Sequence, residues 1–197
     1  MILRDGVFEV PPGKLVECIT HLEMTSRPAP RPERPGASFE LERVERPDPG
    51  WYRELFRRVG TDWLWVSRLL LDDDTLGAII GNPAVRVFAL RSAGREEGLL
   101  ELDFRVAGEC ELAFFGLTGR LIGRGAGRWL MNRALDLAWA EPIDRFWVHT
   151  CSFDHPAALA FYVRSGFRAF RREVEIADDP RLAGLLPRDA APHIPIV

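Results

Sequence analysis

A run of alternate glycines, Leu121-Ile-Gly-Arg-Gly-Ala-Gly-Arg-Trp-Leu-Met131, is the part of the chain best suited to bind an anion. The run ends a strand-like segment and begins a helix-like one. Glycines let the backbone turn tightly and approach a ligand, and the free amides at the positive end of a helix favour a pyrophosphate. From spacing alone, a phosphate site and an ordinary strand-to-helix turn are about equally open.

Two familiar uses of such glycines do not fit their context. A nucleoside-triphosphate loop needs Lys and then Ser or Thr after its last glycine, and this chain has Arg128-Trp129 there. A dinucleotide fold needs its glycines in the first strand-helix unit, with an acidic residue after a second strand. Here the run lies far into the chain, and Asp144 precedes a strand-like segment instead of ending one. A nicotinamide cofactor is therefore not expected.

The segment downstream of the glycines identifies a family. Residues 146–150 are typical of a strand, and residues 154–167 of a short helix closed by Gly166. Together with the glycine run, Ala158, Phe161-Tyr162 and Gly166-Phe167 at their spacings resemble the coenzyme A-binding half of the GNAT superfamily of N-acetyltransferases. The resemblance is strong over residues 109–168 and fades on both sides.

Two positions depart from the family pattern. Ile122 stands where the family usually begins its loop with Arg or Gln, and His155 stands where it often carries Asn. The first change removes a polar loop contact, and the second replaces an amide that faces the ligand by an imidazole. Neither removes the backbone amides, so we expect pyrophosphate binding to survive.

The resemblance implies an α/β fold with a GNAT-type mixed, twisted central sheet and helices on both faces. It implies an N-acetyltransferase that moves an acetyl group from acetyl-CoA to a primary amine by direct transfer in a ternary complex. The acceptor is expected to be a small molecule or a peptide. A non-catalytic acyl-CoA-binding regulatory or structural module stays open, as does a general anion-binding protein. No metal is expected, because His149, Cys151 and His155 do not form a recognised zinc spacing.

The resemblance also assigns catalytic roles. Tyr162, four residues before Gly166, occupies the proton-donor position, with a core tyrosine as the alternative. Glu111 matches the place where some members keep a glutamate base, with a solvated carboxylate as the alternative. A backbone amide near Phe115-Gly116-Leu117 is expected to meet the thioester carbonyl. Gly116 there indicates either a bulge or close packing.

Contacts to the two substrates follow from the same comparison. His155 is expected to bond to the pantetheine arm or to cap its helix. Trp63 and Trp65 are expected to line the acceptor pocket, although on one helix they cannot face the same way. The remaining expected coenzyme contacts are Ile122, Gly123, Arg124, Gly125, Ala126, Gly127 and Arg128.

Sequence patterns predict the elements that position these residues. Segments 6–10 and 15–24 flank Pro11-Pro12-Gly13 and predict an N-terminal β-hairpin. Segment 27–36 contains four prolines and predicts an extended connector. We therefore expect an N-terminal part over 1–36 and an acetyltransferase domain over 37–197. Further strands are expected at 38–46, 85–90, 99–106, 109–118 and 174–176; helices are expected at 48–60, 63–71 and 125–140, and an irregular tail after Asp179.

Composition fits one soluble α/β domain. The chain has 197 residues, 47% of them hydrophobic, and its 26 basic and 29 acidic residues are too balanced for a nucleic-acid surface. The start, residues 1–5, lacks the features of a secretory signal, and no apolar run approaches the about 18 residues that span a bilayer. We expect a cytoplasmic protein without membrane contact and with three free cysteines. A homodimer is compatible with the sequence.

Overall fold

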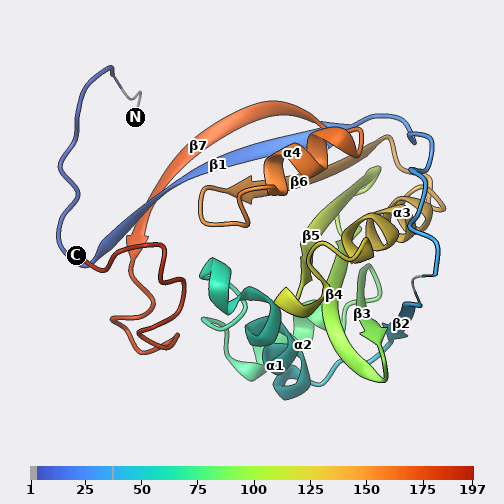
Figure 1. Ribbon diagram of the computed structural model, residues 1–197, viewed down its shortest axis with the longest axis horizontal. Coiled ribbons are helices and arrows are strands. Elements are labelled where there is room, and N and C mark those ends of the chain that lie inside the picture. Colours follow the sequence, from blue (N-terminus) through green and yellow to red (C-terminus); the bar gives the residue numbers. More distant parts are fainter. Residues whose placement is uncertain (1–3, 37) are drawn as a thin grey trace.

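The computed structural model describes residues 4–36 and 38–197. Residue 37, at the expected domain boundary, and residues 1–3 lie outside the described part. The described chain forms one seven-stranded sheet in the order β2-β3-β4-β5-β6-β1-β7 (Figure 1). The strands are β1 (Lys14–Met24), β2 (Glu40–Val44), β3 (Val85–Ser92), β4 (Arg95–Asp103), β5 (Glu109–Leu117), β6 (Arg145–Cys151) and β7 (Arg168–Asp178). The helices are α1 (Pro49–Gly60), α2 (Asp73–Ile80), α3 (Ala126–Ala138) and α4 (Ala158–Arg164), with 3-10 turns η1 (Thr61–Trp63) and η2 (Gly119–Leu121).

Helices cover the sheet on both faces, as expected for a GNAT-type fold. The pairing of β5 with β6 is parallel and the other pairings are antiparallel, so the sheet is mixed. Leu130 and Met131 of α3 and Tyr162 of α4 pack in one core cluster against one face. Tyr52 and Phe56 of α1 pack in a second cluster against the other face, over β3 and β4. The predicted fold class is confirmed.

The predicted N-terminal hairpin is wrong. Residues 6–10 form no strand and are all exposed, so they have no buried face that would hold them in a sheet. The turn at residues 11–13 exists, but the strand after it, β1, enters the central sheet between β6 and β7. Ile19 lies opposite Cys151 of β6 and opposite Glu173 of β7. The N-terminal strand is therefore part of the central sheet.

The proline-rich segment is extended, as predicted, and runs along α3. The buried Asn132 of α3 accepts a hydrogen bond from the Arg31 amide at 3.2 Å and donates one to the Arg31 carbonyl at 2.9 Å. Arg128 donates to the carbonyl of Pro32 at 2.8 Å. Prolines cannot donate such bonds themselves, so the helix side chains supply the partners. The segment thereby carries the chain from β1 across to β2 at the far edge of the sheet (Figure 1).

The helix predicted over 63–71 is also wrong. Leu64 has a positive φ of 55°, which ends the short turn η1, and a helix begins only at Asp73. Asp72 caps this helix by accepting from the Thr75 amide at 2.7 Å. Carboxylates are favourable at the positive start of a helix, so Asp72, Asp73 and Asp74 begin α2 directly after the segment that was predicted to be helical. The other predicted elements are confirmed within a few residues, except that β7 is much longer than 174–176.

Candidate functional site

The site begins where two parallel strands separate. β5 pairs with β6 only from Glu109, opposite Arg145, to Glu111, opposite Trp147. Beyond this point both strands continue, to Leu117 and Cys151, without pairing to one another. A cavity of about 760 Å³ occupies this region and is lined from both strands. Its walls include residues from both core faces, so the cavity crosses the sheet through the gap.

The cavity brings most of the predicted site residues together. Those that line it are Trp63, Trp65, Phe115, Gly116, Leu117, Ile122, Gly123, Gly127, His155 and Tyr162. The predicted residues that do not line it are Glu111, Arg124, Gly125, Ala126 and Arg128. Of these five, the last four belong to the bend and first turn that lead into α3, and Glu111 lies behind the cavity wall.

The glycine bend has the geometry of an anion cradle. Gly123 and Gly125 have positive φ angles of 76° and 87°, which side chains rarely adopt. Gly125 is the N-terminal cap of α3 and makes no side-chain capping bond. Within the described residues, the amides of Gly123, Gly125, Ala126 and Gly127 have no backbone acceptor. These amides at the positive end of a helix suit a diphosphate.

Arginines surround this bend. Arg34, from the proline-rich segment, donates to the Gly123 carbonyl at 3.4 Å, and its side chain packs over Gly125. Arg164 of α4 lines the cavity. Burial and the nearby charges of Arg128 and Arg164 lower the pKa of Arg31, which shows that positive charge is concentrated here. The bend therefore fits the phosphates of coenzyme A, with amides and guanidinium groups as ligands.

Tyr162 reaches the cavity from α4. The residue is 7% exposed, and its ring packs against the rings of Phe115, Phe161 and Phe167. Within the described residues no group makes a hydrogen bond to its hydroxyl, and the residue lines the cavity. Burial, and secondarily the charge of Asp154, raise the pKa of this phenol. The hydroxyl therefore keeps its proton at neutral pH and can donate a hydrogen bond to a ligand atom.

Glu111 contacts the cavity through a histidine. Its Oε1 lies 3.4 Å from Nδ1 of His149, and His149 lines the cavity. The contact with Glu111 raises the pKa of His149, against the opposing effect of burial, and Asp154 and Glu17 raise it further. Glu109, which lies on the same face, is paired with Arg145 at 3.1 Å instead. The geometry offers a histidine base that a carboxylate orients.

Gly116 is a point of close packing. A methyl group there would lie 2.4 Å from Val59 and 2.7 Å from Trp65. The bulge in β5 falls earlier, at Ala113, because the register with β4 shifts between Glu101 and Leu102. The close-packing alternative for Gly116 is therefore correct.

The open edge of β5 presents backbone amides to the gap. The Thr118 amide donates to the Glu97 carbonyl at 2.9 Å, on the β4 side. Amides alternate in direction along a strand, so the Gly116 amide points to β4 like that of Thr118, and the Leu117 amide between them points away from β4. The Leu117 and Phe115 amides therefore face the gap and the cavity, where a carbonyl oxygen would accept from them.

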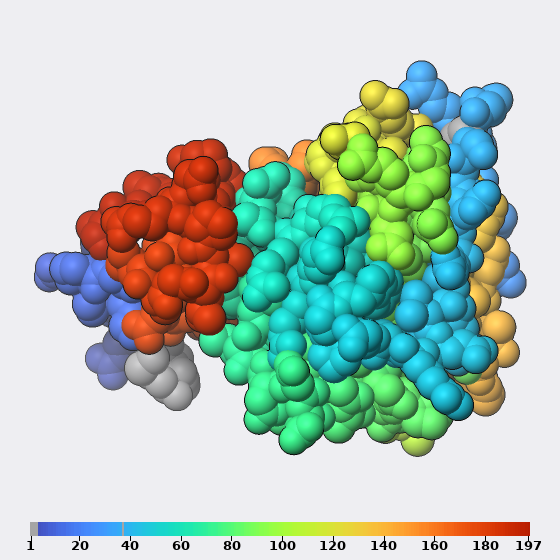
Figure 2. All heavy atoms as spheres, turned by 90° about the horizontal axis from the view of Figure 1, so that it is seen from below, coloured from blue at the N-terminus to red at the C-terminus, as the bar shows by residue number. Residues whose placement is uncertain are grey.

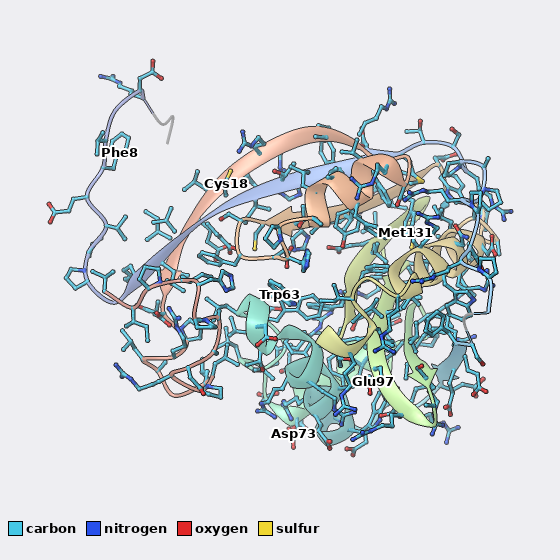
Figure 3. All side chains as sticks on the ribbon, in the orientation of Figure 1. Phe8, Cys18, Trp63, Asp73, Glu97 and Met131 are labelled. Atoms are coloured by element: carbon cyan, nitrogen blue, oxygen red, sulfur yellow. The ribbon has the colours of Figure 1, made fainter. Side chains whose placement is uncertain are left out.

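Both tryptophans line the cavity, so the expectation that they must diverge is wrong. The left-handed turn at Leu64 replaces the expected helix and turns both rings to the same side. Trp65 Nε1 donates to Asp154 Oδ1 at 3.2 Å, and the Trp63 ring meets that of His155 edge-on at 5.2 Å. Figure 3 shows Trp63 between the end of α1 and the turn after β6. His155 Nδ1 accepts from the Ala157 amide at 3.1 Å, so it satisfies the backbone just before α4.

The model of the acetyltransferase (GNAT) family matches residues 19–167. The chain belongs to this family. No curated protein matches the sequence. Among solved structures, this GNAT chain is similar to an N-acetyltransferase from Sphaerobacter thermophilus, with 14% identity, a TM-score of 0.62 and coverage of 86% of this chain and 53% of the other. It is also similar to a functionally unknown conserved protein from Staphylococcus epidermidis, with 9% identity, a TM-score of 0.59 and coverage of 83% of this chain and 62% of the other.

A smaller neighbour gives the same picture of a shared GNAT fold. An aminoglycoside acetyltransferase from an uncultured soil metagenomic sample, in complex with sisomicin, has 14% identity, a TM-score of 0.53 and coverage of 65% of this chain and 87% of its own. Identities this low establish the fold alone. This GNAT chain spans less than two thirds of the length of the two larger neighbours.

Three groups of this GNAT site escaped the sequence reasoning. Arg34 was assigned to a connector, His149 was considered only as a metal ligand, and Glu17 lay in the supposed hairpin. Within the described residues, no group of three or more His, Cys, Asp and Glu side chains is placed to hold a metal ion. Among the same residues, every helix is too short or too polar to cross a bilayer.

Proposed function

We propose that this chain is an N-acetyltransferase that moves an acetyl group from acetyl-CoA to a primary amine by direct transfer in a ternary complex. The observation that carries this proposal is one cavity that joins the glycine bend, Tyr162 and His149 across the gap between β5 and β6. Membership of a family that generally uses acetyl-CoA supports the donor. The acceptor amine would approach from the side of the cavity that His149 lines, across the sheet from the glycine bend.

The chain's own groups fit the donor. The free amides at Gly123 and Gly125 to Gly127, with the Arg34 guanidinium beside them, would hold the diphosphate. When bound, acetyl-CoA supplies an activated thioester. The Leu117 or Phe115 amide would donate a hydrogen bond to its carbonyl oxygen and stabilise the negative charge that develops there. Tyr162 Oη, whose pKa burial raises and to which no described residue makes a hydrogen bond, would give its proton to the departing sulfur.

The acceptor amine must lose a proton before or during transfer, because an ammonium nitrogen has no free electron pair. His149 lines the acceptor side of the cavity and would take this proton, directly or through a water molecule. Glu111 would hold the imidazole and stabilise its charged form through Nδ1. Glu111 is therefore a positioning residue, and the base role expected of it passes to His149.

Two measurements test the proposal. Thermal unfolding is recorded with acetyl-CoA, coenzyme A and nicotinamide dinucleotides, and thiol release is followed with a panel of primary amines. We expect acetyl-CoA and coenzyme A alone to raise the midpoint, as ligands of the folded state do, and thiol release to require an amine. Stabilisation without amine-dependent release would identify a binding module. Equal stabilisation by the dinucleotides would leave only a general anion site.

A further inference from the structure

Two carboxylates face one another on the cavity wall that β1 and β7 form. Leu15, Glu17 and Ile19 alternate along β1, and all three line the cavity. Glu175 of β7 lies directly opposite Glu17 in the antiparallel register and also lines the cavity. Directly opposed residues project from the same face of a sheet. β1 pairs with β6 only from Ile19 onward, so this acidic pair lies in the part of the β1–β7 ribbon that extends beyond β6. That end of the ribbon points away from α3 (Figure 1).

The acidic pair is not neutralised within the described part of the protein. Like charges directly opposite one another on a sheet are destabilising. On this ribbon Lys14 pairs with Asp178 at 2.6 Å and Arg171 with Glu173 at 2.8 Å, while Arg172 bonds to Cys18. Neither Glu17 nor Glu175 has a cationic side chain within ion-pair distance among the described residues. Burial raises the pKa of Glu17, and the charges of Glu175 and Asp154 raise it further, against a hydrogen bond with Cys151 and the charge of His149, which lower it. A bound cation would remove this penalty.

The rest of this end of the cavity is aromatic and apolar. Trp63 and Phe153 line it, together with Leu70 and Leu185. Leu185 comes from the C-terminal tail, which packs beside the segment between α1 and α2 (Figure 2). Aromatic faces attract cations, and apolar side chains suit the methylene groups that join two charged nitrogens. We name this end, bounded by Glu17, Glu175, Trp63, Phe153 and Leu185, the acidic chamber.

An independent observation shows that the same cavity is built for a ligand. Tyr162 is 7% exposed and lines the cavity, and no group of the described residues makes a hydrogen bond to its hydroxyl. A hydroxyl without a protein partner at a cavity wall is free to bond to a ligand atom there. The volume of about 760 Å³ falls in the range of small-molecule sites. The acidic chamber is thus the extension of a ligand cavity.

We propose that the acceptor is a primary amine that carries a second positive charge, a diamine or polyamine, and that Glu17 and Glu175 bind the second cation. This inference rests on the proposed function and names its substrate class. His149 lies opposite His21 of β1, and Glu17 projects from the same face four residues away. Because Glu17 and His149 are near enough to affect one another's charge, an alkyl chain of four or five carbons can join a nitrogen at His149 to one at Glu17.

Steady-state kinetics with saturating acetyl-CoA compares 1,5-diaminopentane with pentylamine, which has the same length and lacks the second charge. We expect kcat/KM to be at least about tenfold higher for the diamine, because only the diamine pairs with the carboxylates. Glu17→Gln should raise KM for the diamine by at least about tenfold more than KM for pentylamine, because the loss of its charge beside His149 affects both substrates alike and only the diamine loses an ion pair. Glu175→Gln, at a more exposed position, should give a smaller effect of the same sign.

Glu173→Gln is the matched control, because Glu173 lies on the same strand, pairs with His21 and Arg171, and does not line the cavity. Glu173→Gln should leave kcat/KM unchanged for both the diamine and pentylamine. Calorimetric titration of 1,5-diaminopentane into the coenzyme A-loaded protein measures binding without turnover. Diamine binding that depends on Glu17 supports the acidic chamber, even if thiol release is absent and the transferase proposal fails. Acetylation of both amines with equal kcat/KM, or diamine binding that Glu17→Gln leaves unchanged, overturns the inference while the transferase stands.

Discussion

Replacing Tyr162 by phenylalanine separates proton donation from binding and from stability. The substitution removes one hydroxyl and keeps the ring, which packs against Phe115, Phe161 and Phe167. Because no group of the described residues makes a hydrogen bond to this hydroxyl, its loss leaves no protein partner unpaired. The free energy of unfolding should therefore change by less than about 0.5 kcal/mol.

The effect on turnover should be much larger. A positioned proton donor contributes about 10²- to 10⁴-fold to a rate, so kcat for thiol release should fall by this factor. The diphosphate contacts lie at Gly123 to Gly127, so the dissociation constant of coenzyme A should change by less than about twofold. In the unsubstituted enzyme, burial raises the pKa of Tyr162, so no loss of activity from its ionisation is expected up to about pH 10.

Three assays on the same protein preparation decide the matter: urea denaturation, calorimetric titration with coenzyme A, and the rate of thiol release against pH. An unchanged kcat in the Tyr162→Phe variant would refute the proton-donor role. A fall in coenzyme affinity as large as the fall in kcat would instead assign the hydroxyl to binding. A loss of several kcal/mol in stability would show that it has a structural partner.

Three further substitutions test the packing, the base and the cradle. Gly116→Ala should lower the free energy of unfolding by about 1–3 kcal/mol, because its methyl group would lie 2.4 Å from Val59. In denaturation experiments, adding Val59→Ala should restore part of this loss. No recovery in the double variant would contradict the close packing of Gly116 and Val59. Glu111→Gln should move the acid limb of the kcat/KM profile to lower pH, because its contact raises the pKa of His149, the group that must be neutral; an unmoved limb would exclude the pair. Gly125→Asp should weaken coenzyme A binding by at least about tenfold in calorimetry, since it puts a side chain and a negative charge into a left-handed position of the cradle; unaltered affinity would place the diphosphate elsewhere.

The elements around the glycine bend were predictable because their signals are local. Gly125 and Gly166 both adopt positive φ angles, 87° and 106°, at the start of α3 and just after α4. Glycine is the residue that allows such conformations, so its spacing marks the ends of these helices whatever the rest of the chain does. The same locality explains why α1, capped by Asp48 before Pro49, was found correctly.

The segment between α1 and α2 was misread because two local rules compete there. Residues 63–71 are apolar enough for a buried helix, but Leu64 turns left-handed and residues 66–71 form turns. Acidic residues end many polar loops and also begin many helices, and at Asp72 the second use applies. Which rule wins depends on the C-terminal tail, since Leu64 packs with Leu186 far along the chain.

The place of β1 was not predictable from its own pattern. Alternation along residues 15–24 fits a hairpin strand and a central strand equally, and the choice depends on pairing with β6 and β7, more than a hundred residues away. The contact of Glu111 with His149 has the same origin. Once Glu111 lies opposite Trp147, alternation brings His149 to the same face, but only the assembled sheet sets that register.

This long-range pairing decides what can be transferred from the family to this chain. The resemblance is specific over residues 109–168, which supply the bend, Tyr162 and His149. Arg34 beside the bend and Glu17 in the acidic chamber both come from the first 36 residues, where the resemblance fades. The N-terminal segment therefore contributes to the donor end and to the acceptor end of one cavity. Because β1 lies between β6 and β7, this segment is also part of the sheet and cannot be removed without loss of the fold. Substitutions of its cavity-lining side chains should consequently alter acceptor choice, even though every residue that the family comparison assigned to catalysis would remain.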